Sequence, residues 1–204
     1  MEVKVSRPLI SSGSLVLRPF EQSDEAAAAA AHAELAAEDF TFLHAHRDGE
    51  LWTAYLARLE LLRTGADLPD GWVPETLLAA EVGGDLVGRA SIRHWLNSWL
   101  ERWGGHIGYC VRPNFRRRGY ATEILRQSLQ IARAIGLDRA LITCDEDNVA
   151  SATVIERCGG LLENIVSAET GSGSKRRYWV DLAYLGVHPA AGGEAGASTS
   201  RSGQ

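Results

Sequence analysis

The chain has 204 residues, of which 45% are hydrophobic and 23% are charged, a composition typical of a globular protein with one well-buried core. Its formal net charge of −5 argues against a general nucleic-acid or membrane-surface binder, because such proteins present an excess of positive charge. No segment reaches the roughly 20 apolar residues of a membrane span, and the N-terminus lacks a signal-peptide core. The three cysteines have no metal-like spacing, so we expect packed, reduced thiols, no bound metal and a cytoplasmic protein.

The N-terminal part of the chain predicts a strand, two helices and a β-hairpin. The apolar residues 15–17 are followed by a proline, which favours a short strand. An alanine-rich run over 26–37 follows a serine and two acidic residues, an order typical of a helix start. Large apolar residues recur at helical spacing over 50–64 and predict a second helix. Two strands over 76–82 and 86–92 then surround a Gly-Gly-Asp turn.

The C-terminal part alternates strands and helices. Tryptophans at 95, 99 and 103 fall at intervals of four, as on one side of a short helix, and we interpret them as core or lid packing. The elements predicted after them are a strand over 106–111, a helix over 119–135, a strand over 140–144, a helix over 149–158, and strands over 161–168 and 177–184. The first three form a β-loop-α-β unit, whose two strands are expected to run parallel with a right-handed crossover.

A basic loop that ends in glycine joins the strand over 106–111 to the following helix. A helix N-terminus offers unpaired N–H groups and a positive dipole end to phosphate, and Gly119 lets the backbone come close. Arg116, Arg117 and Arg118 add charge where a pyrophosphate would lie. The loop has neither the Gly-Lys-Ser/Thr of a Walker loop nor the spaced glycines of a dinucleotide fingerprint. It therefore predicts another kind of nucleotide-cofactor site.

The spacing Arg116-x-x-Gly119-x-Ala121, after a strand and before a helix, resembles the acetyl-coenzyme A (acetyl-CoA) loop of the GNAT family of N-acetyltransferases. Asn148-Val149-Ala150-Ser151 is similar to the Asn-x-x-Ala/Ser helix start of that family, where the asparagine contacts the pantetheine arm. The element order matches from about 15 to 184. The strings around Gly104–Tyr109 and Arg177–Trp179 resemble a bacterial subgroup of predicted acetyltransferases.

This resemblance implies an α/β (α+β) GNAT fold, with a mixed, mostly antiparallel sheet of six or seven strands, splayed central strands and flanking helices. Residues 1–185 would form this domain, and 186–204, mostly Ala, Gly, Ser and Thr, a disordered tail. The implied activity is transfer of an acetyl group from acetyl-CoA to a primary amine by direct attack in a ternary complex. Two alternatives stay open, namely use of a longer acyl-CoA and a non-catalytic CoA-binding sensor. The acceptor would be a small-molecule or peptide amine, and the protein a monomer or homodimer.

The resemblance also assigns residues to the donor. Those expected to bind acetyl-CoA are Val111, Arg116, Arg117, Arg118, Gly119, Tyr120, Ala121, Thr122, Asn148 and Ser151. Around Cys110 and Val111 a backbone N–H would bond the acetyl carbonyl and stabilise the negative charge that develops on it. For Asn148, a simple helix N-cap is the alternative or additional role.

The remaining candidate residues concern proton transfer and the acceptor pocket. His106 is the candidate general base, since an alkyl ammonium must lose a proton before it attacks, and the alternative is a structural histidine bonded within the sheet. Ile155 stands where relatives often place a tyrosine that protonates the departing thiolate, and Tyr109 is a weak substitute for it. His94 and Asn97 are possible linings of the acceptor pocket.

Overall fold

The computed structural model describes residues 14–66, 68–167 and 173–183 of the chain. Its elements, in chain order, are β1 (Val16–Arg18), the 3-10 turn η1 (Gln22–Asp24), α1 (Glu25–Ala36), α2 (Trp52–Thr64), β2 (Glu75–Val82), β3 (Asp85–Arg93), the π-helical turn η2 (Leu100–Gly104), β4 (Ile107–Val111), the 3-10 turn η3 (Pro113–Phe115), α3 (Tyr120–Ala134), β5 (Arg139–Asp145), α4 (Val149–Arg157), β6 (Leu161–Ser167) and β7 (Ser174–Asp181). This is the predicted order, with boundaries that differ by a few residues. The predicted tail over 186–204 lies outside the described residues.

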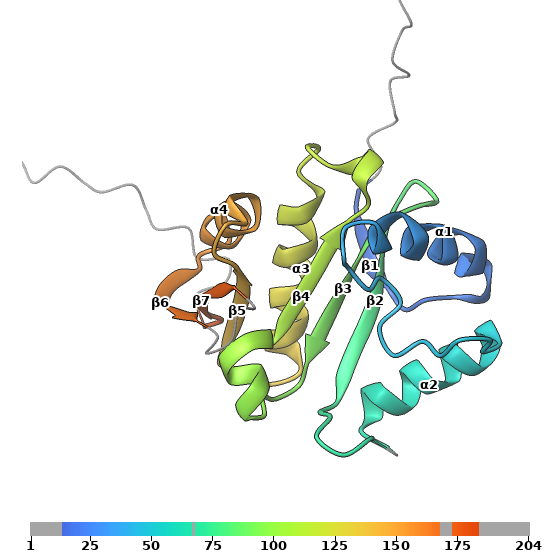
Figure 1. Cartoon of the computed structure of the whole chain (residues 1–204), viewed down its shortest axis with the longest axis horizontal. Coiled ribbons are helices and arrows are strands. Elements are labelled where there is room, and N and C mark those ends of the chain that lie inside the picture. Colours follow the sequence, from blue (N-terminus) through green and yellow to red (C-terminus); the bar gives the residue numbers. More distant parts are fainter. Residues whose placement is uncertain (1–13, 67, 168–172, 184–204) are drawn as a thin grey trace, which may run out of the picture.

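The strands form two antiparallel sheets, of order β1-β2-β3-β4 and β5-β7-β6 (Figure 1). The predicted α+β class, with seven strands, flanking helices and splayed central strands, is confirmed. The expected parallel pairing of β4 and β5 does not form a ladder, because β4 bonds only to β3 and β5 only to β7 within the part of the chain that the structure describes. A gap therefore separates the two sheets.

The two sheets meet at one point, at the start of β4. The N–H of His106 donates to the carbonyl of Leu141 at 2.6 Å, and the N–H of Leu141 donates to His106 Nδ1 at 2.9 Å. Just before this joint, Gly105 has a φ of +64°, and a Cβ there would lie 2.6 Å from the Leu141 carbonyl oxygen. Only glycine allows this approach. The gap between β4 and β5 is thus closed at the His106 end and open toward the basic loop.

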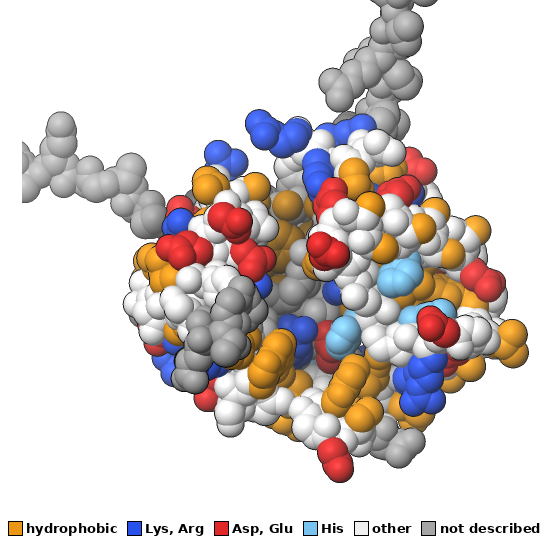
Figure 2. Space-filling view, viewed as in Figure 1, with side chains coloured by type: hydrophobic (Ala, Val, Ile, Leu, Met, Phe, Trp, Pro, Cys, Tyr) orange, Lys and Arg blue, Asp and Glu red, His pale blue; other side chains and the backbone are white. Residues whose placement is uncertain are grey.

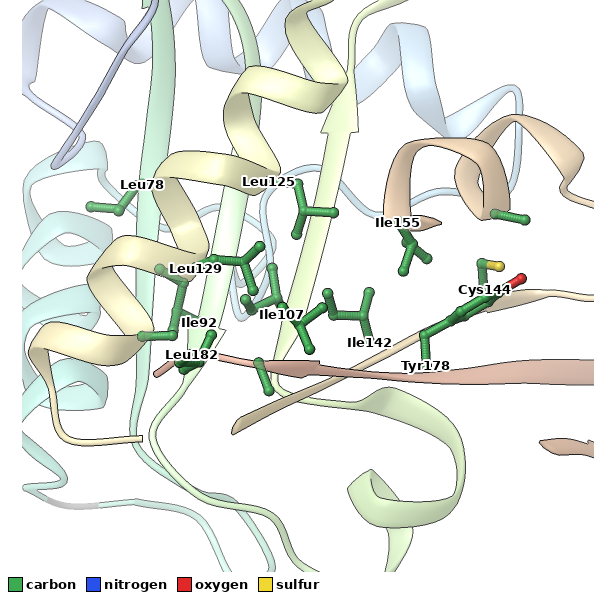
Figure 3. Close-up of a cluster of buried hydrophobic side chains, with 14 residues drawn as sticks. Leu78, Ile92, Ile107, Leu125, Leu129, Ile142, Cys144, Ile155, Tyr178 and Leu182 are labelled. Atoms are coloured by element: carbon green, nitrogen blue, oxygen red, sulfur yellow. The ribbon is translucent and has the colours of Figure 1, made fainter. Parts of the chain in front are cut away.

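The helices cover opposite faces of the four-stranded sheet. One buried cluster joins α1 and α2 to β2, and the thiol of Cys110 packs against it. A second cluster joins α3 and α4 to both sheets, and Figure 3 shows its side chains converging from these elements. Its members include Ile107 from β4, Ile142 from β5 and Ile155 from α4, each at most 1% exposed. This core holds the two sheets together across the gap.

The sequence patterns explain how these elements are buried. In α3, the buried residues Ile124, Leu125, Ser128, Leu129 and Ala132 recur at three- and four-residue intervals, so one face of the helix lies on the sheet. Strand β3 is buried at seven consecutive positions because helices cover both of its faces. Among the described residues, no helix has the length and apolar character needed to cross a membrane.

Candidate active site

The loop between β4 and α3 ends with two residues in the left-handed region. Arg117 has a φ of +62° and Gly119 a φ of +85°, and α3 begins at the next residue. The N–H of Glu123 donates to the Gly119 carbonyl at 3.2 Å, which leaves the N–H groups of residues 120–122 without an acceptor among the described residues. A Cβ on Gly119 would have no heavy atom within 4 Å, so the helix start faces open space. Unpaired donors, a positive dipole end and open space together fit a phosphate group.

The three arginines of the loop have different environments. Arg116 is engaged within the protein, since its guanidinium makes two hydrogen bonds to the Glu38 carboxylate, at 3.0 and 2.6 Å, and one to the Val111 carbonyl at 3.1 Å. Arg118 donates to the carbonyl of Asn114 at 2.9 Å. Arg117 is exposed and has no hydrogen bond or ion pair with the described part of the chain. Arg117 is therefore the arginine most available to an anion.

Strand β4 turns alternate backbone groups toward the gap. The N–H of Arg93 donates to the His106 carbonyl, and the N–H of Arg112 donates to the Val87 carbonyl, in one continuous antiparallel register. Because ladder bonds alternate along an antiparallel pair, even-numbered β4 residues face β3 and odd-numbered ones face away from it. The N–H of Val111 therefore points to the β5 side, whereas the Cys110 backbone faces β3. Val111 is the one of the two candidate positions whose N–H can reach a ligand in the gap.

Cys110 and His106 are both held in structural environments. Burial raises the pKa of the Cys110 thiol, so the thiol stays protonated at neutral pH. His106 is 7% exposed, and its Nδ1 accepts the hydrogen bond from Leu141. Burial, with the nearby charges of Arg93 and Arg139, lowers the pKa of His106 to about 4. With its proton on Nε2 and its lone pair bonded, this imidazole has the contacts of a structural histidine, the alternative considered for it from the sequence.

Helix α4 supplies the other side of the gap. Asn148 caps the helix, with its Oδ1 accepting from the Ser151 N–H at 2.9 Å. The Ser151 hydroxyl lies 3.0 Å from the hydroxyl of Tyr109, which reaches across from β4. Ile155 is fully buried among core residues (Figure 3), so this position offers no group to the gap. The one phenol that touches the start of α4 is thus that of Tyr109, among the described residues.

A cavity of about 240 Å³ opens on the face of the sheet that carries α1 and α2. Its lining residues are His44, Gly71, Trp72, Val73, Glu75, Arg93, Asn97, Trp99 and Leu100. Asn97, one of the two predicted pocket residues, lines it, while His94 Nε2 is bonded to Thr76 at 2.8 Å. Trp99 is 63% exposed and lies at the rim, as a lid residue would. Figure 2 shows the hollowed centre of the molecule, with basic side chains above it and histidine and acidic side chains beside its lower part.

Sequence reasoning missed two residues of this cavity, His44 and Glu75. Glu75 is a buried carboxylate, 4% exposed, and His44 Nδ1 lies 3.1 Å from its Oε2. The two residues are 31 positions apart, and neither belongs to a recognisable motif. The sequence offered only a charged residue at the start of β2, a strand whose other charged residue, Glu81, lies near its far end. No group of three or more His, Cys, Asp or Glu side chains among the described residues could hold a metal ion.

The open helix start, the divided sheet and the cavity fit an acyltransferase that uses a coenzyme A thioester. A family model for the acetyltransferase (GNAT) domain matches residues 14–160. The chain therefore belongs to the GNAT family of acetyltransferases, as the sequence motifs predicted, and takes acetyl-CoA as its co-substrate.

Solved structures share this fold at low sequence identity. The chain is similar to Mycobacterium smegmatis RimJ in complex with CoA-disulfide, with 21% identity over 85% of each chain and a TM-score of 0.61. It is also similar to a GNAT-family acetyltransferase from Bacillus anthracis, with 20% identity over 85% of this chain and 98% of the other, and a TM-score of 0.56. The microcin C7 self-immunity acetyltransferase MccE, in complex with acetyl-CoA and AMP, has 16% identity over 82% and 92% of the chains and a TM-score of 0.57. No curated protein matches the chain.

Proposed function

We propose that the protein transfers the acetyl group of acetyl-CoA directly to a primary amine, with donor and acceptor bound together. The observation that carries this proposal is the gap between β4 and β5, which runs from the unpaired N–H groups at the start of α3 to the joint at His106. It can hold an extended donor with its phosphates at one end and its thioester beside β4. Backbone groups that face the gap then act on the thioester.

The donor is held mostly by backbone groups. The N–H groups of residues 120–122 and the Arg117 guanidinium bind the pyrophosphate, with Arg118 adding charge at the edge. Asn148 and Ser151 contact the pantetheine arm from the α4 side, and capping leaves the Asn148 amide nitrogen available. Arg116 supports the loop through Glu38 and contributes through position rather than direct contact.

Val111 and Cys110 support a direct transfer. The Val111 N–H polarises the acetyl carbonyl and stabilises the charge that develops when the amine attacks. The Cys110 thiol, whose pKa is raised by burial, is not the thiolate that a covalent acetyl-enzyme would need. Its side chain instead lies on the α1 and α2 face, where its bulk would limit the length of the acyl group.

Tyr109 is the group proposed to protonate the departing sulfur. Burial raises the pKa of its hydroxyl to about 12, so the hydroxyl carries its proton at neutral pH. Its contact with Ser151 places that proton at the start of α4, where the pantetheine arm is proposed to lie. Tyr109 thereby takes the role for which position 155, buried as isoleucine, has no hydroxyl.

The acceptor class stays broad at this level, and includes small-molecule and peptide amines bound by a monomer or a homodimer. The three cysteines of the chain are free thiols, which suits a reducing cytoplasm. The acceptor reaches the thioester from the cavity on the α1 and α2 face, opposite the helix that holds the phosphates.

The direct test is turnover. The protein is incubated with acetyl-CoA and a fixed panel of butylamine, phenethylamine, cadaverine and short peptides with a free N-terminus, while released thiol is measured and acetylated product is detected by mass spectrometry. The proposal predicts thiol release that depends on both protein and amine. Tight binding of acetyl-CoA without release on any amine would contradict it and favour a CoA-binding sensor, and faster release from a longer acyl-CoA would favour the other alternative.

A further inference from the structure

We propose that His44, held by Glu75 in the cavity beneath Trp72 and Trp99, binds the acceptor's ammonium group and takes its proton. This assigns the general base to the α1 and α2 face and not to His106. The inference rests on the proposed function, since it names the group that prepares the amine for attack.

One carboxylate oxygen of Glu75 is buried and is free to accept a hydrogen bond. Its Oε2 is paired with His44 Nδ1, whereas its Oε1 has no hydrogen-bond partner and lies 3.8 Å from an Arg93 nitrogen. A buried carboxylate oxygen without a donor is costly, so such an atom indicates a place where a ligand donates. Burial alone would raise the pKa of Glu75, but His44, Arg93 and Ser91 outweigh it and hold that pKa at about 2. The carboxylate is therefore charged at every pH of interest.

Arg93 does not compete for this role. Its Nη1 donates to the carbonyls of Gly104 and Gly105, at 3.3 and 3.2 Å, which fixes the guanidinium against η2. It balances part of the Glu75 charge without making a hydrogen bond to Oε1. The other titratable groups that sense Glu75 are Tyr55 and His94, from α2 and from the end of β3. An ammonium is the donor that would complete this arrangement.

The orientation of His44 leaves one nitrogen for the substrate. With Nδ1–H donated to Glu75, the lone pair is on Nε2, which has no hydrogen-bond partner among the described residues. The ring is stacked on Trp72, with centroids 5.2 Å apart and planes at 22°, and the Tyr55 hydroxyl holds the His44 carbonyl at 3.0 Å. This is the arrangement of a histidine base fixed by a carboxylate. His106 has the opposite arrangement, with its lone pair already bonded.

The face of the sheet that lines the cavity continues to β4 at Gly108, three residues before Val111. Glu75 pairs with Arg93 across β2 and β3, and Ser91 pairs with Gly108 across β3 and β4. Directly opposite residues share a face of the sheet, so Glu75, Ser91 and Gly108 all face the cavity side. Ser91 interacts with Glu75, and a Cβ on Gly108 would lie 3.1 Å from its Oγ. One side chain thus separates Glu75 from the strand that carries Val111.

The cavity walls suit an amine on an apolar stem. Trp72 and Trp99, which are 39% and 63% exposed, present aromatic faces at the rim, and such faces attract alkylammonium groups. Asn97 fixes the rim by donating to the Gly71 carbonyl at 2.7 Å while its Oδ1 accepts from the Leu100 N–H at 2.8 Å. The expected acceptor is a primary amine on a short alkyl or arylalkyl chain, with no carboxylate beside the amine.

The proposed step balances. The ammonium gives one proton to His44 Nε2, and the nitrogen lone pair forms the bond to the acetyl carbon. The carbon–sulfur bond breaks with its electron pair on sulfur. The sulfur takes up the Tyr109 proton, the nitrogen loses its second proton to water, and water in turn reprotonates Tyr109. His44 also returns its proton to water, so that the net release is the one proton of the ammonium.

The test compares His44→Gln and Glu75→Gln with wild type, using the panel amine that turns over fastest. We expect kcat/KM at pH 7 to fall about 100-fold in each variant, as for loss of a general base, with acetyl-CoA affinity by calorimetry and thermal stability of His44→Gln unchanged. The deficit of His44→Gln should shrink toward pH 10, because an alkyl amine then becomes neutral unaided near its own pKa of about 10.4. His46→Gln is the matched control, because His46 lies two residues away and also packs against Tyr55, with ring centroids 5.1 Å apart. This variant should keep wild-type kinetics.

The outcomes separate the two levels of the proposal. Wild-type turnover with full activity in His44→Gln would overturn the assignment of the base and leave the acetyltransferase function standing. If the loss of kcat/KM in His44→Gln stays the same up to pH 10, the assignment is also overturned. A purely structural role of His44 would give this result, because the loss would not depend on the protonation of the amine. If wild type binds acetyl-CoA but acetylates no amine, the proposed function fails and this inference fails with it.

Discussion

At the proposed donor end of the molecule, the chain leaves three backbone N–H groups and the Arg117 guanidinium open to solvent, whereas at the proposed acceptor end it buries one carboxylate, Glu75, beside a fixed histidine. The first end is positive and built from backbone geometry. The second is formed by two side chains, Glu75 and His44, and their contact orients both of them. Under the proposed function, the first end therefore binds pyrophosphate through backbone groups, and the second end binds the acceptor through side chains. Backbone changes should therefore harm donor binding, and side-chain changes should alter the handling of the acceptor.

His106 lies at the joint between these two ends, and its removal should have the largest effect. His106→Ala leaves the buried N–H of Leu141 without its acceptor and should lower the free energy of unfolding by about 3 kcal/mol, as losses of buried hydrogen-bond partners and core volume do. Urea unfolding at pH 7 measures this. His106→Asn places an oxygen near the position of Nδ1 and should recover part of the loss.

The same residue gives a pH dependence of stability. A pKa of about 4 in the folded protein, against 6.5 for a free histidine, means that the unfolded chain binds more protons between these two values. Stability from this group is complete above pH 6.5 and is lost as the pH falls toward 4, by roughly 3 kcal/mol. In His106→Asn this component should be absent. The pH–rate profile near neutrality should be the same in wild type and His106→Asn, and its loss in the variant would restore His106 as the base.

Gly119→Val should show the dependence of the donor end on backbone conformation. A β-branched residue at a φ of +85° is strained by about 1–3 kcal/mol, and its side chain would occupy the open space before the helix start. We expect acetyl-CoA affinity to fall about 10- to 100-fold by calorimetry, as that strain implies. Gly136→Val is the matched control, because Gly136 has a φ of +98° at the far end of α3 with equally open surroundings. It should cost stability while leaving affinity intact; equal affinity losses in both variants would contradict the loop assignment.

Tyr109→Phe removes the proposed proton donor while keeping the ring. We expect kcat to fall about 10-fold, less than a full general-acid effect because water can protonate a thiolate. Acetyl-CoA affinity should stay near wild type, since the lost contact is the one to Ser151. Single-turnover kinetics with the fastest panel amine would measure this, and an unchanged kcat would leave the acid step to water.

Arg117→Ala and Arg116→Ala should separate charge at the donor end from support of the loop. Removing Arg117 should weaken acetyl-CoA binding by up to about 10-fold, as for loss of one charge-assisted hydrogen bond, and the loss should shrink at high salt. Removing Arg116 breaks an exposed pair with Glu38, worth about 0–1 kcal/mol of stability, and should change affinity less. A larger affinity loss for Arg116→Ala would return the phosphate contact to that residue.

The donor end could be read from the sequence because its parts are contiguous. A strand, a basic loop, Gly119 and a helix start follow each other within residues 106–122, and local chain geometry is enough to place their N–H groups. Which of Cys110 and Val111 faces the gap could not be read, because alternation gives the period of a strand but only the register with β3 gives its phase. The pairing of Arg116 with Glu38, 78 positions away, was equally invisible.

The acceptor end could not be read because only tertiary structure assembles it. His44, Glu75 and Asn97 come from three separate segments of the chain, and no local motif links them. His106 looked more suitable as a base because it lies on the motif strand. Its burial and its bond to Leu141, which depend on where β5 meets β4, favour the structural role instead.

Asn97 joins the loop at Gly71 to η2, and so one amide spans the mouth of the cavity. Two segments of the cavity rim, at Gly71 and at Leu100, are therefore tied together by the side chain of one residue. Loss of this amide by substitution would separate the Gly71 loop from η2 without changing any residue of the proposed donor site or the proposed base. The entrance of the cavity and the proposed chemistry therefore depend on different residues, so that a substitution at position 97 would alter the first and leave the second in place.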